Sequence, residues 1–69
     1  MSTLRVRVNG TAREVPDGVT VAGLLASLGT PATGIAVAVD GQVCARAEHG
    51  RTVLADGADV EILTAVQGG

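Results

Sequence analysis

Apolar and charged residues alternate at the start of the chain until an Asn-Gly pair interrupts them. Residues 4–8 read Leu-Arg-Val-Arg-Val, Asn9-Gly10 follows, and residues 11–15 read Thr-Ala-Arg-Glu-Val. Two extended runs joined by Asn-Gly are typical of a β-hairpin with a two-residue turn. This loop length places Arg5 opposite Glu14 on the outer face of the hairpin. The residues expected on the core face of the first strand are Leu4, Val6 and Val8.

An amphipathic helix is predicted after the turn at Pro16-Asp17-Gly18. Thr20 offers a side-chain oxygen that can cap the start of the helix. Gly29 stands where a left-handed residue commonly ends one. Between them, apolar residues recur at i, i+3, i+4 and i+7, which is the spacing of one helical face. These residues are Val21, Leu24, Leu25 and Leu28.

Further extended segments are predicted in the second half of the chain. Residues 35–39 read Ile-Ala-Val-Ala-Val, and Asp40-Gly41 joins them to residues 42–46 as a second hairpin. A short extended piece at residues 52–54 precedes a final strand over residues 60–66. The chain therefore reads as hairpin, helix, hairpin, short strand and final strand.

This order of elements predicts the fold class. One amphipathic helix needs a sheet to cover its apolar stripe, and four or five short strands provide one. The helix is a crossover connection, so the final strand lies beside the first only if the two run parallel. We therefore expect an α+β fold of the β-grasp, ubiquitin-like type. Residues 1–66 are expected to form the domain and residues 67–69 a C-terminal tail.

Composition excludes several classes of partner. The 69 residues are enough for one small domain, of which 46% are hydrophobic and 17% charged, a balance typical of a folded chain. Phe, Trp and Tyr are absent and the net charge is -2. The chain therefore lacks the stacking platforms and basic excess that nucleic-acid binders use. We expect no nucleic-acid partner.

The N-terminus and the cysteine content indicate the cellular compartment. Cys44 is the one cysteine in the sequence, so no internal disulfide can form. Residues 1–5 lack the apolar stretch of a signal peptide, and no run approaches the roughly 18 apolar residues of a membrane span. We expect a cytoplasmic protein with no membrane partner.

Cys44 and His49 are the two side chains that suggest reactive chemistry. A lone cysteine on a strand is more often a small hydrophobic residue than a sulfur relay. His49 has no second His or Cys at a ligand spacing, so we expect no metal site and interpret His49 as a solvated loop residue. The pattern of glycines followed by Lys and Ser or Thr is missing, so no bound nucleotide cofactor is expected.

The sequence ends in Gly68-Gly69 after an apolar run. A frayed end or an expression scar can also be rich in glycine. A functional interpretation is that residues without a Cβ let an enzyme approach the terminal carboxylate closely. An ionised carboxylate is a poor electrophile and needs activation, for example as an acyl adenylate. The three residues Gln67–Gly69 can reach about 10 Å beyond the domain.

Several stretches of the second half resemble the ThiS family, the sulfur carriers of thiamine biosynthesis. They are residues 34–41 (Gly-Ile-Ala-Val-Ala-Val-Asp-Gly), residues 53–57 (Val-Leu-Ala-Asp-Gly), residues 60–63 (Val-Glu-Ile-Leu) and the terminal Gly68-Gly69. The family often has an aromatic residue where His49 stands and a proline where Ala45 stands. These two departures bear on the packing around them and leave the tail unchanged.

The resemblance implies a reaction and its partners. An E1-like adenylyltransferase that uses ATP and Mg would adenylate Gly69, and a sulfur donor system would convert it to a thiocarboxylate. Thiazole synthase would then take up the sulfur. On this view the chain is a carrier and not an enzyme. Gly69 carries the sulfur, while Gly68 and Gln67 give access to it.

A docking surface for these partners is expected beside the tail. If Val60 and Ile62 face the helix, strand alternation turns Leu63 outward. There it is expected to lie beside Arg5 and Arg7 of the first strand. An exposed leucine alone means little, but next to the tail it becomes a candidate contact for the activating enzyme and the synthase.

Three alternatives stay open. The small subunit of molybdopterin synthase shares the fold and the tail, but it is usually longer and has aromatic and proline residues before its glycines. Residues 63–67 lack that character. A ubiquitin-like modifier joined to lysines of target proteins would also use the two glycines. An interaction module would carry them incidentally.

Overall fold

The computed structural model describes residues 2–31 and 33–64. Its elements are β1 (Thr3–Val8), β2 (Thr11–Pro16), α1 (Val21–Leu28), β3 (Ile35–Val39), β4 (Gln42–Cys44), the 3-10 turn η1 (Arg46–Glu48) and β5 (Asp59–Thr64). The predicted order of hairpin, helix, hairpin and final strand is confirmed. Residues 65–69 lie outside the described residues, so the predicted boundary between domain and tail stays a prediction.

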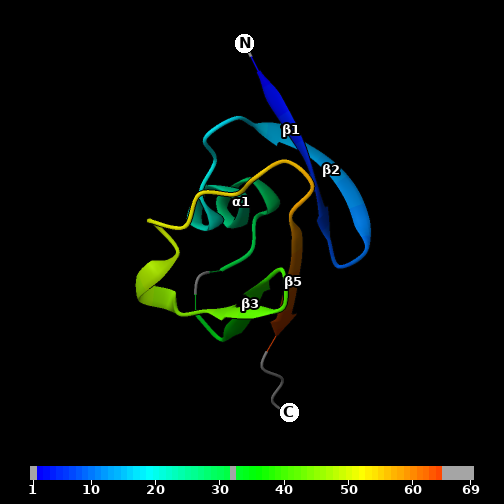
Figure 1. Ribbon diagram of the computed structural model, residues 1–69. Coiled ribbons are helices and arrows are strands. Elements are labelled where there is room, and N and C mark those ends of the chain that lie inside the picture. Colours follow the sequence, from blue (N-terminus) through cyan, green and yellow to red (C-terminus); the bar gives the residue numbers. More distant parts are fainter. Residues whose placement is uncertain (1, 32, 65–69) are drawn as a thin grey trace.

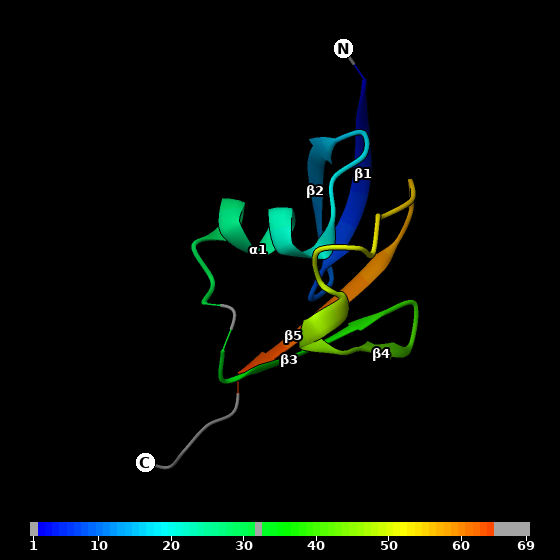
Figure 2. The same cartoon turned by 90° about the vertical axis from the view of Figure 1, so that its left-hand side faces the viewer.

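The five strands form one mixed sheet in the order β2-β1-β5-β3-β4. β1 pairs antiparallel with β2, and β3 pairs antiparallel with both β4 and β5. At the centre, β1 and β5 run parallel. Figures 1 and 2 show α1 packed on one face of this sheet, with no described helix on the other. The predicted α+β fold of the β-grasp type is therefore confirmed.

Both hairpins turn through residues in the left-handed conformation. The first has the predicted register, with Arg5 paired to Glu14. Its turn residues Asn9-Gly10 have φ angles of 51° and 85°, and Asp40-Gly41 in the second hairpin have 52° and 83°. Asn, Asp and Gly tolerate this conformation best, which explains why these pairs can close two-residue loops.

α1 begins and ends at the predicted residues. The Thr20 hydroxyl oxygen accepts a hydrogen bond from the backbone N–H of Gly23 at 3.1 Å, which satisfies one of the free donors at the helix start. Gly29 ends the helix with a φ of 72°. The predicted stripe faces the sheet, with Leu24 fully buried and Leu28 half-buried.

The core lies between α1 and the inner face of the sheet. It contains no Phe, Trp or Tyr side chain, because the sequence has none. Valine dominates it, as expected for β-branched residues that pack well on a pleated sheet. The buried hydrophobic residues are Val6, Val8, Val15, Val21, Leu24, Leu25, Val37, Leu54, Ala58 and Val60.

The segment between β4 and β5 differs from the prediction. The second hairpin was expected to extend to Arg46, but β4 ends at Cys44 because residues 46–48 form η1. The extended piece at residues 52–54 makes one isolated bridge, between Val53 and Thr20. This segment therefore packs beside the start of α1 instead of adding a full strand to the sheet.

Candidate functional site

β5 is the strand that leads to the C-terminal residues, and Thr64 is its last residue. The predicted site residues Gln67, Gly68 and Gly69 lie outside the described residues. β5 sits between β1 and β3 in the sheet, so its position is fixed by neighbours on both sides. The described part of the candidate site is therefore the end of β5 and the outer sheet face around it.

Leu63 belongs to an apolar area on the outer face of the sheet. Its side chain is 65% exposed, and it pairs directly with Ala36. Next along this face, Ala38 lies between Glu61 on β5 and Val43 on β4, and Val43 is 83% exposed. We call Leu63, Ala36, Ala38 and Val43 the outer apolar patch. The predicted outward orientation of Leu63 is confirmed; strand alternation along β3 and β4 was the signal for the other three.

Arg5 and Arg7 share the outer face with Leu63, but the prediction that they lie beside it is wrong. The parallel register pairs Arg7 with Asp59, four residues before Leu63. At roughly 3.3 Å per strand residue, Leu63 lies about 13 Å further along β5. The reason is that β1 turns away at Asn9-Gly10, so β1 and β5 pair over only a short stretch.

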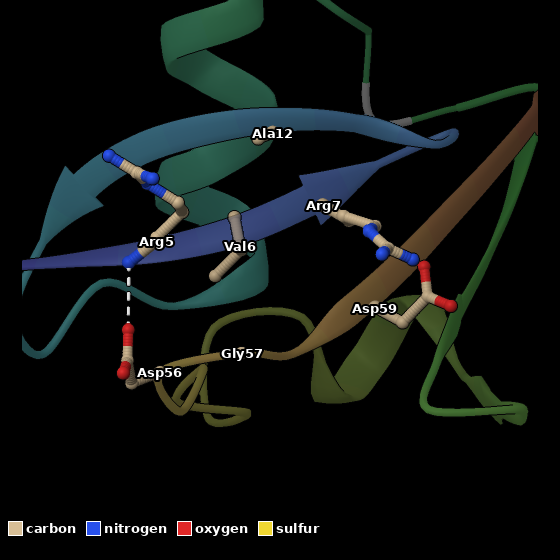
Figure 3. A pocket seen from close by; sticks show the side chains of 7 residues that line it. All are labelled: Arg5, Val6, Arg7, Ala12, Asp56, Gly57 and Asp59. Carbon is tan, nitrogen blue, oxygen red and sulfur yellow. Dashed lines mark hydrogen bonds between the residues drawn. The ribbon is translucent and has the colours of Figure 1, made fainter.

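The two arginines line a shallow pocket at the start of β5 instead. Its lining residues are Arg5, Val6, Arg7, Ala12, Asp56, Gly57 and Asp59, and Figure 3 shows the side chains of Arg7 and Asp59 directed toward each other. The Asp56 carboxylate accepts a hydrogen bond from the Arg5 backbone N–H at 2.9 Å. The Gly57 N–H donates to the Arg5 carbonyl at 2.7 Å. These contacts fix the backbone just before β5.

Further along β5, Asn9 contacts the strand through its backbone and its side chain. The Asn9 N–H donates to the Val60 carbonyl at 2.9 Å. The Asn9 carboxamide accepts from the Ile62 N–H at 2.8 Å and donates to the Ile62 carbonyl at 3.2 Å. The sequence marked Asn9 only as a turn residue, and the Asn-Gly pair gave no signal of this second role.

His49 is buried, and the interpretation of a solvated loop residue is wrong. It is 6% exposed, and its Nε2 lies 3.2 Å from the Cys44 carbonyl oxygen. Since a carbonyl can only accept, Nε2 carries the proton in this contact. The His49 carbonyl in turn accepts from the Ala22 N–H at 2.9 Å, so η1 and the loop after it are held against α1. The aromatic residue that ThiS proteins often have here was the available signal for burial.

Cys44 lies on the inner side of β4 and packs against the core. It is half-buried, and its thiol donates to the Thr52 hydroxyl at 3.5 Å. This is the environment expected of a small hydrophobic residue, and it lies on the sheet face opposite Leu63. None of the contacts of Cys44 with the described residues indicates a sulfur-relay role.

Two further findings concern the described residues only. Across residues 2–31 and 33–64, no cluster of three or more His, Cys, Asp or Glu side chains could hold a metal ion. In the same part of the chain, no helix is long and apolar enough to cross a membrane. The expected cytoplasmic location stays a prediction.

The β-grasp sheet, with α1 on its inner face and an exposed leucine six residues before the Gly69 that ends the sequence, defines a small ubiquitin-like protein. Comparison with known proteins narrows this class. Residues 6–69 match the ThiS family, and the chain belongs to that family. Its members are small sulfur carriers of thiamine biosynthesis, so the resemblance inferred from the sequence is confirmed.

A solved structure supports the same assignment. The thiamine biosynthesis protein ThiS from Geobacter metallireducens superposes with a TM-score of 0.81 at 29% sequence identity, covering 96% of this chain and 100% of that chain. No curated protein sequence matches the chain. Fold and family therefore agree over nearly the whole length.

Proposed function

We propose that the carboxylate of Gly69 is the group on which this carrier holds sulfur. An E1-like adenylyltransferase binds ATP and Mg, and a Gly69 carboxylate oxygen attacks the α-phosphorus, forming an acyl adenylate and releasing pyrophosphate. A sulfide-level sulfur from a donor system then attacks the carbonyl carbon. The bond to AMP breaks, leaving a thiocarboxylate and AMP. Thiazole synthase takes its sulfur from this thiocarboxylate.

The observation that carries the proposal is the extent of the family match, which runs to residue 69 and so includes both glycines. Gly68 has no Cβ, which lets the backbone and nucleotide groups of a partner approach the reacting carbon. Gln67 directly precedes the two glycines in the sequence and gives the partner further access to them. The chain supplies the acyl group and the partner supplies the ATP chemistry.

We further propose that the outer apolar patch docks the activating enzyme, and that the synthase uses the same surface afterwards. Leu63 is the member of the patch nearest the tail in sequence, only four residues before Gln67. Apolar side chains that lose water on contact dominate binding energy in protein interfaces. Arg7 lies about 13 Å from Leu63 along the same face and Arg5 about 20 Å, so they would meet the rim of such an interface, where charge guides association.

Mass spectrometry tests the proposed reaction. The chain is incubated with a ThiS-activating enzyme, ATP, Mg and a sulfide donor. The mass of its C-terminal proteolytic fragment is then measured. The expected result is a mass increase equal to replacing one oxygen by sulfur. A matched chain with one alanine added after Gly69 should fold equally well and show no increase. An unchanged mass of the native chain, with its tail intact, would contradict the proposal.

The same incubation separates the alternatives. Conjugates to lysines of other proteins, in place of a thiocarboxylate, would indicate a protein modifier. A thiocarboxylated chain is then offered to thiazole synthase and to the large subunit of molybdopterin synthase in parallel. Sulfur transfer only to the first is expected from the family match; transfer only to the second would reassign the pathway.

A further inference from the structure

The Asn9 side chain occupies the place of a missing strand residue beside β5. The backbone pairing of β1 with β5 covers Arg7 and Val8, after which the chain turns away. Beyond that point the Asn9 carboxamide bonds both backbone groups of Ile62, accepting at 2.8 Å and donating at 3.2 Å. A carboxamide carries an acceptor and a donor on one planar group. It therefore supplies, from one side chain, the two bonds that Ile62 would have made with the backbone of a longer, parallel β1.

Ile62 needs this substitute because of its place in the sheet. In an antiparallel pair, alternate residues direct both their N–H and C=O groups away from the partner strand. Ile62 pairs with Val37 of β3, and its bonds to Asn9 show that its polar groups point to the β1 side. No residue of β1 stands opposite them in the register. Asn9 therefore supplies the backbone bonds on this side of β5 just before Leu63.

We propose that Asn9 is a positioning residue for activation of the carrier. By holding Ile62 in the sheet, it fixes the orientation of Leu63, the next residue, and the position of Thr64, the last residue of β5. This inference rests on the proposed function of Gly69. Strand ends open locally at low free energy. We call the form in which Ile62 stays paired in the sheet the closed form. If the activating enzyme binds only this form, its apparent Kd rises as the closed fraction of the carrier falls.

Two substitutions separate this role from the role of Asn9 in the turn. Asn9→Gly keeps a residue that adopts positive φ readily and removes both side-chain bonds. Asn9→Asp keeps an acceptor for the Ile62 N–H but replaces the donor with a second oxygen facing the Ile62 carbonyl. Thr20→Ala is the matched stability control, because it removes the helix cap at Gly23 and makes no contact with the end of β5.

The test measures adenylation rate against carrier concentration, with amide hydrogen exchange on the same proteins. Asn9→Gly is expected to raise KM roughly three- to tenfold, with Asn9→Asp between it and the native chain. The rate at saturating carrier should stay within about twofold, because every enzyme molecule is then occupied by a carrier in the closed form. Exchange at the Ile62 amide should accelerate in Asn9→Gly, while exchange at the Leu24 amide, which is bonded to the Thr20 carbonyl at the start of α1, should change much less.

Three results would overturn the inference. The first is an unchanged KM for Asn9→Gly although Ile62 exchanges faster. The second is a KM increase as large in Thr20→Ala, which would trace the effect to global stability. The third is an Ile62 amide that exchanges at the native rate in Asn9→Gly. Failure of the native chain to be adenylated at all would instead remove the proposed function, and this inference with it.

Discussion

Asp40 and Asp59 exchange two hydrogen bonds between the turn of the second hairpin and the first residue of β5. The Asp40 N–H donates to the Asp59 carbonyl at 2.8 Å, and the Asp59 N–H donates to the Asp40 carboxylate at 2.9 Å. Asp56 and Asn9 make related side-chain contacts, with the backbone of Arg5 in β1 and of Ile62 in β5, respectively. Three turn residues thus hold strand backbone in place as well as closing their own turns.

Asp40→Gly should lower the free energy of unfolding by about 1 kcal/mol, because the Asp59 N–H loses its acceptor while the positive φ stays accessible. Asp40→Asn retains an oxygen at the same place and should stay within about 0.5 kcal/mol of the native chain. Urea unfolding followed by circular dichroism measures both, since the chain has no Trp or Tyr to report by fluorescence. Equal losses in the two variants would show that the carboxylate bond contributes nothing.

Leu24→Ala should cost about 2–5 kcal/mol, because Leu24 is fully buried at 0% exposure between α1 and the sheet. A domain of this size has a total stability of only about 3–5 kcal/mol. The variant should therefore be largely unfolded at room temperature by circular dichroism. Leu28→Ala, on the same stripe but only half-buried, is the matched control and should leave the domain folded.

His49→Phe should cost only about 1 kcal/mol, because the ring still fills the space under α1 while the bond to the Cys44 carbonyl is lost. His49→Ala also loses the packing and should cost about 2 kcal/mol. Thermal unfolding of the three chains gives the order directly. If both variants matched the native chain, His49 would behave as the solvated residue that the sequence suggested.

Leu63→Asp should raise KM for the activating enzyme by roughly tenfold or more, because it places a charge in the outer apolar patch. The melting temperature should change little, since Leu63 is 65% exposed. Val53→Asp is the matched control: Val53 is 60% exposed and bridges to Thr20 beside α1, away from the patch. An equal effect of the two substitutions would remove Leu63 from the docking surface.

The elements that could be predicted from the sequence are those determined by local chemistry. Asn9-Gly10 fixed the register of the first hairpin because a two-residue loop allows only one pairing. The apolar stripe from Val21 to Leu28 predicted the helix, and the capping residues Thr20 and Gly29 predicted its two ends. The parallel pairing of the first and last strands followed from the crossover helix. The exposure of Leu63 followed from alternation.

The features that could not be predicted depend on distant parts of the chain. The register between the parallel strands β1 and β5 is not determined by residues near either strand. Leu63 was therefore expected too close to Arg5 and Arg7. The burial of His49 depends on where η1 meets α1. The side chains of Asn9 and Asp40 bond to β5, a strand that begins at Asp59. Asp59 lies 50 residues after Asn9 and 19 residues after Asp40 in the sequence.

The sheet order also determines when this protein can fold. Each hairpin is local, but the two hairpins do not pair with each other. β1 is joined to β3 through β5, which is the last of the described strands along the chain and the middle one of the sheet. A nascent chain that stops before Asp59 holds two separate hairpins and a helix with an incomplete surface to cover. Closure of the core therefore waits until β5 has emerged. A growing chain therefore completes its core and its outer sheet face in the same event.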